Sequence, residues 1–149
     1  MNQTQVQDRQ HWMSVLARTS LANIQKAWRA MPEQPEYSLL RQPETGLVMI
    51  QARTNGNGAP FNMGEMTLTR CSVSIHNTIG HAYIAGRNPE HAELAAIFDG
   101  LLQLPEHNAR LMETVINPME KNIAEQIKTK AKQVASTRVD FFTMVRGED

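Results

Sequence analysis

His91 and Glu93 lie two residues apart at the predicted start of a helix, and their types and spacing come near to a catalytic motif. In zinc deaminases a histidine at this spacing binds the metal and a glutamate transfers protons, but that motif also needs a downstream Pro-Cys-x-x-Cys. The single cysteine, Cys71, lies upstream, so the motif is incomplete. Polar residues also collect at helix starts for capping, and this is the more common reason for such a pair.

Arg87 lies in the loop Gly86–Pro89, immediately before the same predicted helix. Free backbone N–H groups at a helix start, with a cation beside them, can bind the oxygens of a phosphate or a phosphonate. The alternative is that Arg87 pairs with a carboxylate while the helix start contacts water. The spacing alone favours this alternative, because the Gly-Lys-Ser/Thr of a phosphate-binding loop is missing.

Arg70 is a charged residue within an otherwise apolar predicted strand. A bulge beside it could direct its side chain to a functional surface, or this end of the strand is simply exposed, and we keep both interpretations. The candidate ligand-binding residues are therefore Arg70, Arg87, His91 and Glu93. We predict no catalytic residue, since the sequence has no Gly-x-Ser-x-Gly elbow and no recognisable base near Cys71.

The composition argues against several classes of protein. Fifteen basic residues balance fifteen acidic ones, so no net charge attracts nucleic acid or an anionic membrane. Five histidines without metal-binding spacing and a single cysteine predict no metal site built from this chain alone. No apolar run approaches the ~20 residues of a membrane span. Residues 1–10 are polar and lack the apolar core of a signal peptide, so we expect a cytoplasmic protein.

The elements that would position these side chains begin with helices over residues 8–31, predicted from two apolar stripes. Ser20 can cap a second helix within this range, and Pro32 ends it. The sequence then predicts about four strands, with a turn at Thr45-Gly46 between the first two and a hairpin turn at 76–78 between the last two. These strands span 37–41, 47–53, 64–75 and 79–85.

The strand 64–75 has an irregular apolar pattern. Its apolar residues occupy even positions before residue 69 and odd positions after residue 70. Because side chains alternate along a strand, this change of parity predicts a bulge or a kink near residues 69 and 70.

Helices are predicted again after the strands. Asn88 as N-cap and Pro89 at the first position are a strong start signal, and Pro105 ends that helix. A helical region then runs over 106–137 with an interruption at Asn117-Pro118, and its second half has few large apolar residues. The sequence therefore predicts an α+β protein with a mostly antiparallel sheet. We expect one domain over 1–149, in which 120–149 is an extension that docks on a partner.

Both ends of the chain carry large apolar side chains among polar neighbours. Terminal segments fray unless they are held in place, so these groups either fold back on the sheet as one more strand or dock on another subunit. The residues predicted to form a partner interface are Trp12, Val139, Phe141, Phe142, Met144 and Val145.

Several segments, in order along almost the whole chain, resemble one family. They are Gln10–Leu16, Glu44–Val48, Ile50–Arg53, Thr67–Arg70, Gly86–Arg87 with His91–Glu93, and Arg138–Gly147. Together they are similar to the PhnG family, the G subunits of the bacterial carbon–phosphorus lyase core complex.

The resemblance implies a role in phosphonate breakdown under phosphate starvation, within a soluble complex of G-, H-, I- and J-like subunits. It implies that G and I are intertwined and that G, H and I, with a separate L-like protein, replace the adenine of ATP by a phosphonate. The product would be a ribose 1-phosphonate 5-triphosphate, and the nucleobase-displacing groups would belong to the I-like subunit. The iron–sulfur cluster and S-adenosylmethionine would belong to the J-like subunit, which cleaves the carbon–phosphorus bond. This chain would bind no cofactor alone.

Overall fold

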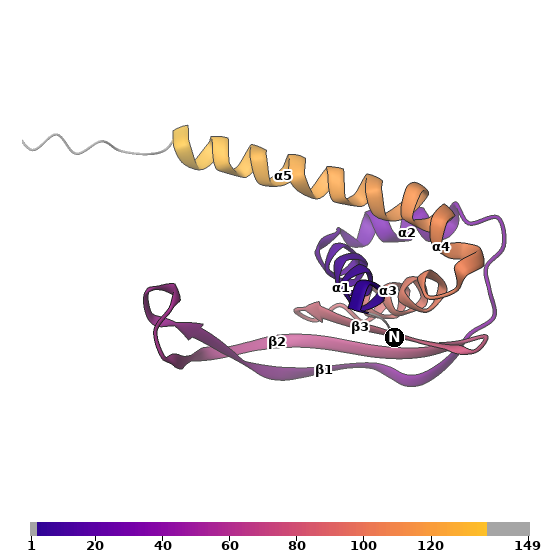
Figure 1. Cartoon of the computed structure of the whole chain (residues 1–149), viewed down its shortest axis with the longest axis horizontal. Coiled ribbons are helices and arrows are strands. Elements are labelled where there is room, and N and C mark those ends of the chain that lie inside the picture. The colour runs from indigo at the N-terminus through magenta and orange to yellow at the C-terminus, as the bar shows by residue number, and fades with distance from the viewer. Residues whose placement is uncertain (1–2, 137–149) are drawn as a thin grey trace, which may run out of the picture.

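The structure, a computed structural model, describes residues 3–136 and has the predicted α+β class. Two helices precede a three-stranded antiparallel sheet in the order β1-β2-β3, and further helices follow (Figure 1). Within the described range, no helix is long and apolar enough to cross a membrane. The elements are α1 (Gln3–Arg18), α2 (Leu21–Arg29), β1 (Ser38–Arg53), β2 (Pro60–Ile75), β3 (Thr78–Ala85), α3 (Pro89–Leu102), α4 (Pro105–Leu111) and α5 (Asn117–Ser136), with a 3-10 turn at Thr54–Gly56 and a π turn at Met112–Ile116.

Helix boundaries follow the local signals in the sequence. The break at Ser20 is confirmed, and its Oγ caps α2 by accepting a hydrogen bond of 3.2 Å from the Asn23 backbone N–H. The start of α3 at Pro89 is confirmed as well, with Asn88 in the N-cap position. The Asn88 side chain itself donates to the Ala85 carbonyl instead of capping the helix. The predicted interruption of the last helical region is confirmed by the π turn before α5.

Within residues 3–136 the sheet has three strands, where the sequence predicts about four. The predicted turn at Thr45-Gly46 is wrong, because both residues lie within the continuous strand β1 and pair with Thr69 and Leu68 of β2. Thr-Gly has some turn propensity, but β2 offers hydrogen-bonding partners along nearly the whole of β1, and this pairing outweighs the local preference. The predicted hairpin between β2 and β3 is confirmed, and His76 in its connection has a φ of 48°.

A register shift does lie beside Arg70, near the position of the predicted bulge, but its extra residue is on β1 and not on β2. β2 pairs with β3 without any register shift, whereas shifts occur between β1 and β2, where Arg41 faces Ser72 but Glu44 faces Arg70. The change of parity along β2 has a different cause. Odd positions from residue 69 onward face the helices and are buried, while Met66, at an even position, lies on the opposite face.

Helix α3 is the centre of the hydrophobic core. It packs on β2 and β3, and α1 and α2 pack on α3, so the helices lie on one side of the sheet (Figure 1). All residues of α3 from Leu94 to Leu102 are buried, as expected for a helix that is apolar on nearly all sides. Phe98 of α3 meets Trp28 of α2 edge to face, with ring centroids 6.3 Å apart.

Candidate functional site

The loop between β3 and α3 holds Arg87, and the side chain of Thr69 fixes this loop. Thr69 is fully buried; its Oγ1 donates to the Gly86 carbonyl at 2.6 Å and accepts from the Asn88 N–H at 3.1 Å. Gly86 has a φ of 83°, a conformation that favours glycine, and its N–H donates to the Thr67 carbonyl at 2.8 Å. Arg87 itself is exposed, and it forms no hydrogen bond or ion pair with any residue that the structure describes.

His91 lies inside the protein. It is 5% exposed, and its Nε2 donates a hydrogen bond of 2.8 Å to the carbonyl of Leu16, near the end of α1. The bond satisfies a carbonyl group of the last turn of α1, which has no partner within the helix, and it ties α1 to the start of α3. This arrangement is that of a histidine that stabilises the fold.

Glu93 is half-buried and accepts a hydrogen bond of 2.6 Å from the hydroxyl of Tyr37. This hydrogen bond, helped by partial burial and by the charge of Glu93, raises the pKa of Tyr37 to about 12. The pair connects the segment before β1 to α3, so the carboxylate of Glu93 is already engaged within the chain.

Arg70 lies on the face of the sheet that points away from the helices. Its Nε donates to Glu44 on the paired strand at 2.8 Å, and Arg41 donates to the same carboxylate. These two hydrogen bonds, first that from Arg41, lower the pKa of Glu44. The four candidate residues therefore do not converge on one place: Arg70 is on one side of the sheet, and His91 and Glu93 are on α3 on the other side.

Ser72 and His81 form a polar pair that the sequence did not reveal. They face each other on β2 and β3, and Ser72 Oγ lies 2.9 Å from His81 Nδ1. A serine and a histidine in contact are two parts of a nucleophilic site, but no carboxylate bonds the His81 ring among the residues that the structure describes. The sequence did not indicate this pair, because the two residues become neighbours only through the pairing register of β2 and β3.

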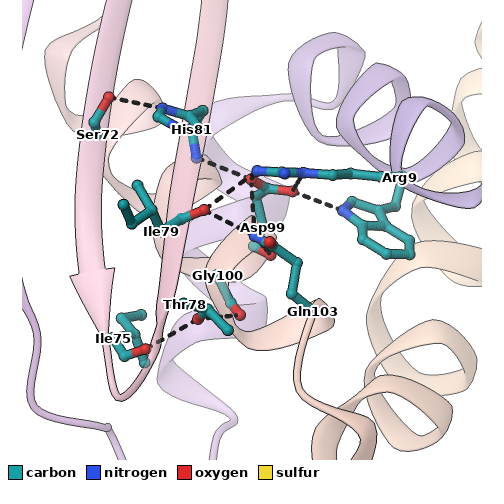
Figure 2. Close-up of polar contacts among 10 residues, drawn as sticks. Arg9, Ser72, Ile75, Thr78, Ile79, His81, Asp99, Gly100 and Gln103 are labelled. Carbon is teal, nitrogen blue, oxygen red and sulfur yellow. Dashed lines mark hydrogen bonds and ion pairs between the residues drawn. The ribbon is translucent and has the colours of Figure 1, made fainter. Parts of the chain in front are cut away.

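Asp99 is the other residue that sequence reasoning missed. It is fully buried in α3, and its carboxylate accepts hydrogen bonds from Arg9 at 2.7 and 3.2 Å, from Trp12 Nε1 at 2.9 Å and from the His81 N–H at 2.8 Å (Figure 2). A single acidic residue inside the apolar run 94–102 was the available signal. Asp99 holds α1, α3 and β3 together, and its acceptor oxygens are occupied.

The predicted interface residues divide into two groups. Trp12 is 6% exposed and belongs to the core of the chain itself, and its part in a partner interface stays a prediction. The other residues (Val139, Phe141, Phe142, Met144 and Val145) lie outside the described residues, and their role stays a prediction. Within residues 3–136, no group of three or more His, Cys, Asp and Glu side chains could hold a metal ion.

Cys71 is expected to be inert towards thiol reagents in the folded protein. It is 1% exposed, and burial, reinforced by the charge of Glu93, raises its pKa to about 11, so very little thiolate exists at pH 8. Reaction with 5,5′-dithiobis(2-nitrobenzoate) should be at least about a hundredfold slower in buffer than in guanidinium chloride. If the folded chain reacts with this reagent as fast as the unfolded chain does, the Cys71 thiol is not buried.

Two comparisons with known proteins match nearly the whole chain. A sequence model of the family described as "Phosphonate metabolism protein PhnG" matches residues 7–147. A protein of Rhizobium meliloti (strain 1021), described as "Alpha-D-ribose 1-methylphosphonate 5-triphosphate synthase subunit PhnG", is 42% identical over 145 residues, which make up 97% of this chain and 92% of that protein. Both matches include the β1–β2 hairpin and the loop that holds Arg87. The chain therefore belongs to the family of the phosphonate metabolism protein PhnG.

Proposed function

We propose that this chain is a structural subunit of a cytoplasmic enzyme that replaces the adenine of ATP by a phosphonate, giving an α-D-ribose 1-phosphonate 5-triphosphate. A phosphonate oxygen forms a bond to C1′ of the ribose while the bond from C1′ to adenine N9 breaks. Adenine leaves with that electron pair and takes up a proton. The observation that carries this proposal is the 42% identity to a synthase subunit over 97% of the chain.

In this proposal the reacting groups belong to an I-like subunit, and H- and L-like proteins complete the synthase. The engagement of three of the four candidate side chains within the chain supports a structural role. Arg70 is paired with Glu44, His91 is bonded to a backbone carbonyl, and Glu93 accepts from Tyr37. Side chains that already stabilise the fold are poorly placed to bind or transform a substrate.

The exposed half of α5 supports docking on a partner. Met119 and Ile123 are buried, whereas Ile127 and Val134, on the same side of the helix, are 58% and 70% exposed. Figure 1 shows this end of α5 projecting beyond the body of the molecule. The apolar stripe thus continues past the core, and the C-terminal residues 137–149 follow it. We propose that both parts contact the I-like subunit.

The interface is tested by the double change Phe141→Ala, Phe142→Ala. Aromatic anchors commonly supply about 2 kcal/mol or more each to an interface, so co-purification with the I-like subunit should fall by at least about tenfold. Val6→Ala, at an exposed apolar residue of α1, is the control and should leave co-purification unchanged. If the double variant is recovered in a stoichiometric complex, the C-terminal segment is not part of the interface.

A second candidate function is direct binding of the triphosphate or the phosphonate through Arg87. The observation in its favour is that Arg87 is exposed beside the start of α3 and unpaired among the described residues, in contrast to Arg70. Loss of one charge-assisted hydrogen bond to a phosphate costs roughly 1.5–3 kcal/mol, so Arg87→Ala in the assembled complex should raise the KM for ATP or phosphonate by about ten- to a hundredfold.

The matched control for Arg87→Ala is Arg29→Ala, which changes another exposed arginine. If the Arg87→Ala complex assembles and turns over normally, direct binding by Arg87 is eliminated. If KM rises while assembly stays intact and Arg29→Ala has no effect, the chain contributes to ligand binding at a subunit interface.

A further inference from the structure

The outer half of α5, residues 124–136, carries a local excess of positive charge. Every residue of this half is exposed, and Figure 1 shows it projecting beyond the body of the molecule. It contains three lysines (Lys128, Lys130 and Lys132) against one acidic residue, Glu125, whereas basic and acidic residues balance over the whole chain. Within residues 3–136, no hydrogen bond or ion pair engages the ammonium group of any of these lysines.

These lysines border an apolar stripe on both of its sides. Ile127 and Val134 are seven positions apart, so they lie on the same side of the helix, and they are 58% and 70% exposed. At 3.6 residues per turn, Lys128 lies about 100° to one side of Ile127, and Lys130 lies about 60° to the other side. Lys132, four positions after Lys128, continues the first of these two borders.

Contacts within the helix do not account for the lysines. A cation stabilises the C-terminus of a helix only in the last turn, and the last described turn of α5 has no basic residue. Lys128 and Lys132, four positions apart, repel each other. Glu125 is three positions before Lys128, but no ion pair joins them in the structure. Glu125 also lies on nearly the opposite side of the helix from Ile127, two positions away.

We propose that the outer half of α5 docks in a groove of the I-like subunit that has an apolar floor and aspartate or glutamate carboxylates along both rims. The inference deepens the proposed function and rests on it for the identity of the partner. Ile127 and Val134 pack on the floor, and the lysines on both borders extend to the carboxylates, since a lysine stem can lie along an apolar surface. Glu125 faces away from the groove, so no carboxylate of this half of the helix is buried.

The composition of the stripe favours a protein groove over other partners. Helices that lie on a membrane present Trp, Phe or Leu, whereas this half presents Ile127, Ala131 and Val134 and has no aromatic residue. Nucleic acid would bind the lysines through its phosphates but would leave the exposed stripe in water. A second copy of the same surface would bring lysines of like charge together, which opposes association.

Zero-length cross-linking tests the groove in the assembled complex. A carbodiimide joins an amine to a carboxylate as an amide, with loss of water, only where the two groups are in contact. Lys128 and Lys130 should each be joined to an aspartate or glutamate of the I-like subunit, as identified by mass spectrometry. Lys26, exposed on α2, is the control and should not be joined to that subunit. The inference is overturned if either border gives no such link, if the links lead only to Glu125 or to another subunit, or if Lys26 links equally well.

Charge reversal provides a second measurement. The double change Lys128→Glu, Lys130→Glu places an acidic residue on each border, so recovery of the I-like subunit at low salt should fall at least about tenfold. Lys26→Glu, Arg29→Glu is the matched control, because it makes the same change of charge at exposed residues of α2 and should leave recovery unchanged. Circular dichroism should show equal helicity for both variants.

The possible failures of this test have different meanings. Normal recovery of the Lys128→Glu, Lys130→Glu variant would overturn the inference and leave the proposed function intact. If the wild-type complex binds vesicles that contain phosphatidylserine, and this variant does not, the surface contacts a membrane and the inference is wrong. If the wild-type chain forms no complex with the I-like subunit, the proposed function fails together with the inference.

Discussion

Replacing Asp99 by alanine is expected to lower the free energy of unfolding by about 3–5 kcal/mol, the usual cost of removing one partner of a buried ion pair. The Arg9 guanidinium, 21% exposed, would lose its only carboxylate partner among the described residues, at 2.7 Å. The Trp12 indole N–H and the His81 N–H would lose the acceptor that satisfies them inside the protein (Figure 2). Each buried donor left without an acceptor adds its own desolvation penalty, about 1–3 kcal/mol.

Guanidinium unfolding followed by tryptophan fluorescence measures this effect. Glu44→Ala is the control, because Glu44 also accepts from two arginines but lies on the exposed face of the sheet. That change should leave the midpoint of unfolding almost unchanged, since solvent screens exposed ion pairs. In a double-mutant cycle, Arg9→Ala and Asp99→Ala should be non-additive by about 1–3 kcal/mol. Equal midpoints for Asp99→Ala and Glu44→Ala would show that the network does not hold α1, α3 and β3 together.

Replacing Gly80 by alanine should be the second severe change. β3 crosses α3 at this residue so closely that a Cβ on Gly80 would lie 1.9 Å from the Ala96 carbonyl oxygen and 2.7 Å from the Gly100 nitrogen. Both of these atoms belong to the backbone of α3 and cannot rotate away. The helix would have to move off the sheet, and we expect a loss of stability of about 3 kcal/mol or more, at the upper end of the cost of overpacking.

Gly46→Ala is the matched control for Gly80→Ala. Both are strand glycines, but a Cβ on Gly46 would meet no atom within 4 Å. Its effect should stay within about 0.5 kcal/mol, as for most exposed positions. Thermal unfolding followed by circular dichroism compares the two variants. A Gly80→Ala protein as stable as Gly46→Ala would mean that α3 does not pack against β3 at this distance.

The helix starts and the second hairpin could be predicted because their signals are local. Ser20 and Asn88-Pro89 specify caps within a few residues, and the turn after Ile75 is flanked by strands that pair directly with each other. No long-range information is needed for any of these. The same is true of the break before α5, where the Asn117-Pro118 pair marks the new helix.

The sheet was predicted less well, because the pairing of distant segments decided its form. Thr45-Gly46 has turn character, yet pairing with β2 holds it in a strand. The pattern along β2 indicated a bulge only on the assumption that all its apolar residues face one core. Met66 instead lies on the exposed part of β2 that precedes its pairing with β3. The sequence alone does not distinguish apolar residues that pack in the core from apolar residues that contact a partner.

The candidate site was the least predictable part. Contacts such as Asp99 with Trp12, 87 residues apart, have no signature in the local sequence. His91 and Glu93 were identified from their types and spacing, but burial and bonding to Leu16 and Tyr37 give them roles in the fold. For this family, resemblance along the whole chain carried more information about function than any single motif.

Adenine release from ATP in the presence of methylphosphonate is the most direct test of the proposed role. The H-, I- and L-like proteins are assayed with and without this chain, and the product is identified as ribose 1-methylphosphonate 5-triphosphate by phosphorus NMR. We predict stoichiometric, phosphonate-dependent release of adenine only when this chain is present. Release at the full rate without it would contradict its assignment as a required subunit of the synthase.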